Sequence, residues 1–168
     1  MERTHLLREV NIFYDLNEEQ LKRITDICQE STYHQGTLIF QENTASNELY
    51  IIVEGMVDIQ VDPHILGVEV ADVLGPTTIT TLQRSQVFGE MALVDQGLRS
   101  ASAKCASRYA KLLVIKREDL IRLCEEDYQL GYLVMRNMAA DLAFKIRSTD
   151  LMVREQLLWR SHPGARKS

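Results

Sequence analysis

Residues 87–103 gather groups that suit a small anionic ligand, and they read VFGEMALVDQGLRSASA. Gly89 has no Cβ, so the backbone there can approach a ligand closely. The next four residues, from Glu90 onward, favour about one turn of helix, and the free N–H groups at a helix start attract anions. Glu90 also supplies a carboxylate acceptor, Arg99 a guanidinium and Ser100 a hydroxyl. This set predicts a site for a molecule with one phosphate and one sugar hydroxyl.

Each of these residues also has an ordinary structural interpretation. The whole stretch could be a plain connection from strand to turn to helix to strand. Glu90 could be a solvated acid favoured by the helix dipole. Arg99 could form a surface ion pair with Glu90 or Asp95, which would contribute little. Ser100 could simply fill a position in a strand.

The same stretch resembles a known pattern. Its three blocks, FGEMAL, VDQGL and RSA, are similar in residue type and spacing to the phosphate-binding cassette of cyclic-nucleotide-binding domains. The resemblance implies that Arg99 pairs with a cyclic phosphate, that Glu90 accepts a hydrogen bond from the ribose 2′-hydroxyl, and that Ser100 donates to the phosphate or a base edge. The candidate ligand-binding residues in the cassette are therefore Phe88, Gly89, Glu90, Met91, Ala92, Arg99, Ser100 and Ala101.

Short strands are expected before and after the cassette. A capping-box pattern begins at Asn17, and apolar residues at helical spacing predict a helix from Glu18 to about Glu30. Strands are expected at 32–35, 38–40, 49–53, 56–61, 100–107 and 109–115, and a further hairpin is expected across 68–82. The continuously apolar run 111–115 is typical of a buried strand. The stretches DLNEEQL, GTLIF and LYIIVEG also resemble the opening of the family's roll, so the likeness covers about residues 12–150.

The predicted fold is mainly β with flanking helices: a jelly-roll-like β-roll of about eight strands, an N-terminal helix and a long C-terminal helix. Helical spacing returns at Arg117, and a long helical pattern runs from about Tyr128 to Trp159. We expect a roll with its N-terminal helix over 1–127, a lid or dimerisation helix over 128–160 and a flexible tail over 161–168.

The long helix carries a second candidate contact. Leu142, Ile146, Thr149, Val153 and Gln156 recur at alternating steps of four and three, the rhythm of a coiled-coil seam. A homodimer through this helix is therefore expected, and the alternative is a stripe that only packs on the roll. The helix also resembles that of the catabolite activator branch of the family, which implies that Thr149 faces the base and favours cAMP over cGMP. Otherwise Thr149 is a surface or packing residue.

Composition excludes several classes of protein. The formal net charge is −5, which argues against a nucleic-acid surface, and no apolar run approaches the about 18 residues that a membrane span needs. The N-terminus lacks the apolar core of a signal peptide, and the three cysteines suit reduced thiols in a cytoplasmic protein. Too few residues follow Trp159 for a helix-turn-helix domain, so we expect no DNA binding and a protein effector of unknown identity.

Two other hypotheses about the function of this chain remain open. A cupin-like metalloenzyme would need clustered histidines, yet His5, His34, His64 and His162 are scattered. A haem- or redox-sensing relative of the same roll would use one histidine or the cysteines, which lack iron–sulfur spacing. The sequence thus predicts a non-enzymatic cyclic nucleotide sensor with no cofactor and no metal.

Overall fold

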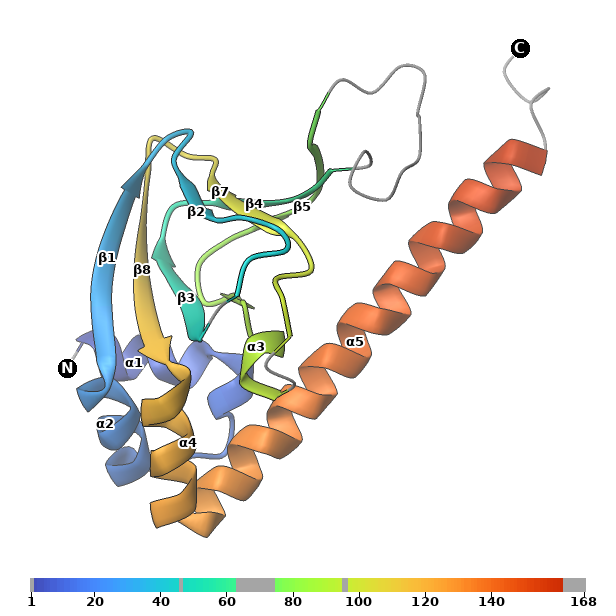
Figure 1. Cartoon of the computed structure of the whole chain (residues 1–168). Coiled ribbons are helices and arrows are strands. Elements are labelled where there is room, and N and C mark those ends of the chain that lie inside the picture. The colour runs from blue at the N-terminus through green and yellow to red at the C-terminus, as the bar shows by residue number, and fades with distance from the viewer. Residues whose placement is uncertain (1, 46, 63–74, 95–96, 162–168) are drawn as a thin grey trace.

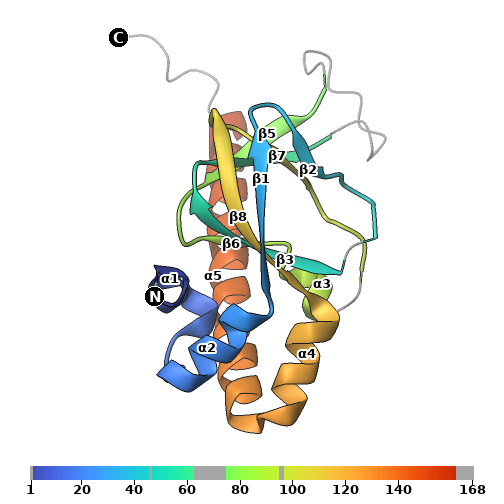
Figure 2. The same cartoon turned by 90° about the vertical axis from the view of Figure 1, so that its left-hand side faces the viewer.

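The computed structural model describes residues 2–45, 47–62, 75–94 and 97–161. Helices gather at one end of a β-roll, and one long helix runs from that end along the molecule (Figure 1). The turned view places the helices α1, α2 and α4 on the same end of the roll (Figure 2). The predicted fold class is confirmed.

Within the described residues, eight strands form two four-stranded antiparallel sheets. The first sheet has the order β1 (Cys28–His34), β8 (Tyr109–Lys116), β3 (Glu48–Glu54) and β6 (Val87–Phe88). The second has the order β2 (Leu38–Phe40), β7 (Ser102–Cys105), β4 (Val57–Val61) and β5 (Thr77–Leu82). Neighbours in each sheet come from distant parts of the sequence, and the segment before β7 lies beside the segment before β3, where Arg99 exchanges backbone hydrogen bonds with Asn43 and Thr44.

The central strands of the first sheet, β3 and β8, are buried on both faces, which explains why they are apolar, whereas the outer strand β1 is polar and partly exposed. On β3, Leu49 and Ile51 pack with the helices, whereas Tyr50 and Ile52 point into the roll and pack against the second sheet. Strand β8 alternates in the same way. Successive side chains of a strand face opposite sides, so a strand between two cores must be apolar at every position. The prediction of a buried strand at 111–115 is confirmed.

Helices cover the outer face of this sheet. They are α1 (Glu2–Glu9), the 3₁₀ turn η1 (Asn11–Phe13), α2 (Glu18–Asp26), α4 (Arg117–Glu126) and α5 (Tyr128–Ser161). The predicted capping box is present at α2: the Asn17 side chain accepts from the Gln20 amide at 2.9 Å, and the Gln20 side chain accepts from the Asn17 amide at 3.1 Å. This cap fixes the start of α2 where the sequence placed it.

The predicted end of α2 is wrong by about one turn. The helix ends at Asp26, and β1 begins at Cys28 rather than at Thr32. Residues 28–34 pair in full register with β8, from Cys28 opposite Ile115 to His34 opposite Tyr109. Gln29 and Glu30 are good helix formers, but pairing with a buried strand outweighs local propensity. Of the hairpin expected across 68–82, the second arm is strand β5, which pairs with β4. The first arm lies outside the described residues, so the hairpin itself stays a prediction.

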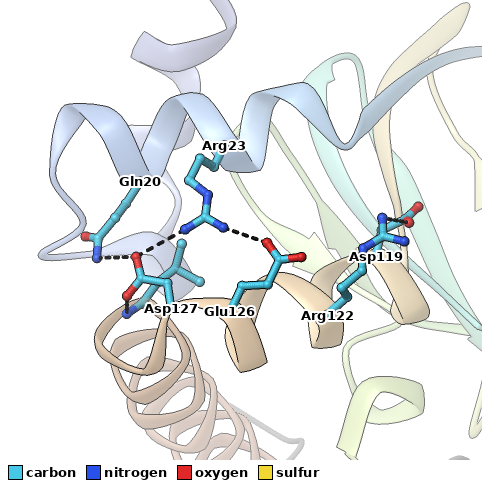
Figure 3. A network of polar contacts seen from close by, with 7 residues as sticks. Gln20, Arg23, Asp119, Arg122, Glu126 and Asp127 are labelled. Atoms are coloured by element: carbon cyan, nitrogen blue, oxygen red, sulfur yellow. Dashed lines mark hydrogen bonds and ion pairs between the residues drawn. The ribbon is translucent and has the colours of Figure 1, made fainter.

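The junction between α4 and α5 is tied to α2 by a network of polar contacts (Figure 3). Asp127 lies between the two helices and accepts hydrogen bonds from Gln20 Nε2 at 3.2 Å and from the Leu130 amide at 2.9 Å. Arg23 forms ion pairs with Asp127 at 3.4 Å and with Glu126 at 2.8 Å. The network fixes the direction in which α5 leaves the helical end.

Helix α5 has a packed first half and an exposed second half. Val134 and Met138 are buried, and the buried Asn137 amide donates to the Tyr14 carbonyl at 2.7 Å. Phe144 and Ile146 are 66% and 62% exposed. None of the helices in the described residues is long and apolar enough to cross a membrane.

Candidate functional site

The predicted cassette forms a compact turn at the open edge of the first sheet. Strand β6 ends at Phe88, Gly89 has a φ of +78°, and the short helix α3 (Met91–Val94) follows. Phe88 is buried and stacks on the Tyr50 ring, with centroids 5.1 Å apart. The stack fixes the point at which the chain leaves the sheet and enters α3.

Gly89 is required for two reasons. Its positive φ is unfavourable for residues with a Cβ. A Cβ at this position would also lie under 3.0 Å from Arg99 Nη1 and 3.0 Å from the Glu48 carbonyl. The missing side chain therefore makes room for the guanidinium of Arg99 directly beneath the cassette.

Arg99 is buried, with 5% of its surface exposed. Its Nη1 donates to the Gly89 carbonyl at 3.2 Å and its Nη2 to the Glu48 carbonyl at 3.0 Å, and its guanidinium lies 3.9 Å from the centre of the Phe40 ring. Burial, above all, lowers the pKa of Arg99, but a guanidinium stays charged in proteins. The Nε atom is buried and has no hydrogen-bond partner within the described residues. A surface ion pair is thus wrong for Arg99, because the guanidinium is buried and its hydrogen bonds within the described residues go to two neutral carbonyls, with the charges of Glu48 and Glu90 near enough to raise its pKa.

Glu90 is buried as well, with 5% of its surface exposed. Its carboxylate receives Lys145 of α5, whose Nζ lies 2.8 Å from Glu90 Oε1 and 2.8 Å from Asp141 Oδ2. Burial would lower the pKa of Lys145, but the two carboxylates outweigh it and raise that pKa. A solvated first-turn acid is therefore the wrong description of Glu90. The ribose acceptor predicted from the sequence is in contact with the long helix.

The remaining cassette residues surround these two charges. Ser100 is exposed, and its hydroxyl lies 3.6 Å from the Met91 sulfur, so it faces α3. Ala101 is buried, and Met91 is 47% exposed. Ala92 contributes its backbone to the first turn of α3. The structure brings the predicted cassette residues together around Gly89, and their roles toward a ligand stay predictions.

Thr149 lies away from this group. It is exposed on α5, and its hydroxyl donates to the Lys145 carbonyl of its own helix at 3.0 Å. Of the predicted seam, Leu142 packs partly on the helical core, whereas Ile146 and Val153 are exposed. The Gln156 side chain lies outside the described part. The stripe thus leaves the roll after Leu142.

A cavity of about 550 Å³ borders Arg99. It is lined by Ile39, Phe40, Ala45, Asn47, Glu48, Tyr50, Arg99, Lys116, Arg117 and Glu118. Among the cassette side chains that the structure describes, Arg99 lines this cavity, and Glu90 and Met91 do not. The cavity therefore reaches the predicted phosphate partner, Arg99, but not the predicted ribose acceptor, Glu90.

The described histidines and cysteines form no metal cluster. Among the residues whose placement is described, no three His, Cys, Asp or Glu side chains are grouped to hold a metal ion. Cys28 and Cys105 are free and buried, and Cys124 is free and partly buried. His64 and His162 lie outside the described residues.

The contact of Lys145 with Glu90 and Asp141 was not predicted from the sequence. The signal was present, because Lys145 follows Met138 and Leu142 at the spacing of one helix face, and that face is otherwise apolar and packed. A lysine that continues a buried stripe needs a buried acceptor. The acid one turn earlier, Asp141, supplies one such acceptor, and Glu90 of the cassette supplies the other.

Comparisons with known proteins agree with this architecture. A family model described as the cyclic nucleotide-binding domain matches residues 30–127. The chain is 34% identical over 140 residues to the cyclic AMP receptor protein of Thermus thermophilus, covering 83% of this chain and 59% of that protein. It is 30% identical over 136 residues to a cGMP-dependent protein kinase of Drosophila melanogaster, covering 74% of this chain and 16% of the kinase.

A solved structure shows the same fold. The catabolite activator protein of Thermus thermophilus superimposes with a TM-score of 0.70 at 30% identity, covering 87% of this chain and 62% of that one. The chain thus spans less than two thirds of the length of these relatives. Because the family model covers more than half of the chain and agrees with the observed roll, the chain belongs to the family of cyclic nucleotide-binding domains.

Proposed function

We propose that this chain binds a 3′,5′-cyclic nucleotide in the cassette and acts as a sensor rather than as an enzyme. Arg99 pairs with the cyclic phosphate, and the first amides of α3 donate to it. Glu90 accepts from the ribose 2′-hydroxyl, and Gly89 allows the close approach. Ser100, beside Met91, adds a hydroxyl to the phosphate side.

The burial of Arg99 is the observation that carries this proposal. Within the described residues, the hydrogen bonds of the buried guanidinium go to two neutral carbonyls, so it retains a charge that an anion can neutralise. A charge-assisted contact to a phosphate contributes about 1.5–3 kcal/mol. Micromolar affinity needs about −8 kcal/mol in total. The phosphate and ribose contacts together supply a large part of that after ordering costs.

The nucleotide is proposed to be cAMP ahead of cGMP. Relatives named for each nucleotide are similar to this chain, so their names favour neither. The preference rests on Thr149, which lies one turn beyond Lys145 on α5 and has an exposed side chain that a base can reach when the helix closes.

Calorimetry tests the binding function. We expect heat with cAMP or cGMP and a loss of at least about tenfold in affinity for Arg99→Lys, because lysine lacks the planar fork that binds phosphate through two donors. Arg122→Lys is the matched control, since Arg122 is exposed on α4 and pairs with Asp119. Circular dichroism checks that each variant is folded. No heat with cAMP, cGMP or a cyclic dinucleotide, or equal affinity in Arg99→Lys, would refute the function.

Movement of α5 is the proposed output, passed to a protein effector or across a homodimer. The second half of the helix exposes Ile146 and Val153 on one stripe of the predicted seam. Sedimentation of Ile146→Asp tests this seam against Phe144→Asp, which removes an equally exposed apolar side chain off the stripe. We expect only Ile146→Asp to shift a dimer toward the monomer. A wild-type chain that sediments as a monomer with and without nucleotide, or equal behaviour of the two variants, would rule out the seam.

A further inference from the structure

The backbone of Arg99 is held by the loop that connects β2 to β3. The Asn43 amide donates to the Arg99 carbonyl at 2.8 Å, and the Arg99 amide donates to the Thr44 carbonyl at 2.9 Å. The next residue on each side, Ala45 and Leu98, forms an isolated antiparallel bridge. Arg99 is therefore paired as in a short ladder, although its partners come from a distant part of the chain.

The same segment contacts the other end of Arg99. Strand β2 ends at Phe40, immediately before this loop, and the Arg99 guanidinium lies 3.9 Å from the centre of the Phe40 ring. A cation at this distance from an aromatic face is attracted to it. Residues 40–44 thus contact both the backbone and the charged head of Arg99.

The backbone conformation of Asn43 shapes this segment. Its φ is +62°, in the left-handed region that asparagine tolerates better than most residues. The turn is closed at the Gln41 carbonyl, which accepts from the Thr44 amide at 3.3 Å and from the Thr44 hydroxyl at 2.6 Å. The Asn43 side chain is exposed. What Asn43 supplies is therefore a left-handed turn that points its N–H group at Arg99.

We infer that Asn43 is a positioning residue for the cyclic nucleotide: its left-handed backbone keeps residues 40–44 against Arg99 and so sets where the guanidinium meets the phosphate. This inference rests on the proposed function and adds a residue outside the cassette that determines affinity. A guanidinium binds phosphate through a planar fork of donors, so small displacements of Arg99 weaken the contact. Binding groups need to be held to within about 0.5 Å of the productive geometry.

Ser85 offers a matched control for Asn43. It is the third residue of another four-residue turn, residues 83–86, which is closed by a hydrogen bond of 3.1 Å between its first and last residues. Its φ is +64°, and its amide donates at 2.8 Å, but to the carbonyl of Ile52. Ser85 also precedes Gly89 by only four residues. A general disturbance of the cassette should therefore be at least as large from Ser85 as from Asn43.

Calorimetry with cAMP and cGMP tests the role of Asn43. Asn43→Val places a β-branched residue at a left-handed φ, and we expect affinity about three- to tenfold weaker, less than for Arg99→Lys because the guanidinium is kept. Asn43→Gly accepts the same φ and should bind within about twofold of wild type. Ser85→Val should also bind within about twofold, although it carries the same backbone cost in urea unfolding.

Three results would overturn the inference. Unchanged affinity in Asn43→Val would show that Arg99 is positioned without the turn. Equal losses in Asn43→Val and Ser85→Val would assign the effect to general destabilisation. A loss in Asn43→Gly as large as in Asn43→Val would assign it to the asparagine side chain instead of the backbone. If circular dichroism shows that Asn43→Val does not fold, Asn43→Ala replaces it, with a smaller loss expected in the same direction.

Nuclear magnetic resonance separates failure of this inference from failure of the proposed function. The Nε–Hε signal of Arg99 is assigned in the ligand-free chain by its disappearance in Arg99→Lys. We expect this signal to shift or broaden in Asn43→Val and to stay at its wild-type position in Asn43→Gly and Ser85→Val. If wild type binds no cyclic nucleotide, the proposed function fails, and this signal alone decides whether Asn43 positions Arg99. An unchanged signal in Asn43→Val would then refute it.

Discussion

Replacing Gly89 with alanine tests whether the cassette is built around the guanidinium of Arg99. A Cβ there would lie under 3.0 Å from Arg99 Nη1 and 3.0 Å from the Glu48 carbonyl, which is backbone and cannot easily move. Gly36 offers a matched control, because its φ of +80° is almost the +78° of Gly89 and a Cβ on Gly36 would meet nothing within 4 Å. The two substitutions therefore share the backbone cost and differ only in what the methyl group meets.

The structure sets the expected magnitudes. Holding alanine at a left-handed φ costs about 1 kcal/mol, which is the whole expected effect of Gly36→Ala. At Gly89 the methyl must also displace the Arg99 guanidinium, which lies against Gly89 and donates to two carbonyls. Losing one hydrogen bond from a charged donor costs about 1.5–3 kcal/mol. We therefore expect Gly89→Ala to lower the free energy of unfolding by about 3 kcal/mol.

Urea unfolding of the ligand-free variants measures this difference. A double-mutant cycle with Arg99→Met assigns it, because the excess cost of Gly89→Ala should largely disappear once the guanidinium is gone. Equal destabilisation by Gly89→Ala and Gly36→Ala would show that Arg99 moves aside freely. An excess that persists in the Arg99→Met background would place the clash with the backbone instead.

Three further predictions concern the helical end. Asn17→Ala removes the capping box of α2 and should cost about 1 kcal/mol in urea unfolding, whereas Asn17→Asp, which keeps a cap, should cost less. Asn137→Leu leaves buried carbonyls of the N-terminal segment without their amide donor and should cost about 1–3 kcal/mol; unfolding at the wild-type midpoint would contradict it. The hydrogen bond from the Leu130 amide is the largest cause that lowers the pKa of Asp127 in the folded chain. The ionised Asp127 side chain therefore stabilises the fold fully above its unfolded pKa of about 3.9, and this stabilisation is lost as pH falls through the folded pKa. The stability gap between wild type and Asp127→Asn should accordingly shrink below about pH 4, and a constant gap down to pH 2 would contradict it.

Local signals in the sequence predicted much of the architecture. The capping box at Asn17, the apolar strands and the long helix from Tyr128 each follow from neighbours within a few residues, and each is confirmed. The cassette was visible for the same reason, because Gly89, Glu90 and Arg99 lie within one short stretch. These features can be predicted from the sequence because the interactions that cause them join residues close together in the chain.

Contacts between distant segments could not be predicted in this way. The helical pattern continued through Cys28, and only pairing with β8, more than 80 residues later, turns that stretch into a strand. The acceptors of Arg99 are backbone carbonyls, which every residue has, so no residue type marks Glu48 as its partner. Lys145 meets Glu90 across 55 residues, and nothing in the spacing of either segment sets that meeting.

The packing of α5 implies that the helix cannot move alone. Its first half is joined to the N-terminal segment by Asn137 and by an ion pair between Arg136 and Asp15 at 2.9 Å, and its start is bound to α2 through Asp127. Exposure rises along the helix, from buried Met138 through Leu142 to exposed Ile146, so Lys145 stands where packing ends. If only the second half moves, the helix must bend near residue 142; if α5 moves as a whole, α2 and the residues around Asp15 must move with it. Because α2 and α4 are clamped by Arg23, the second motion would carry the whole helical end against the roll.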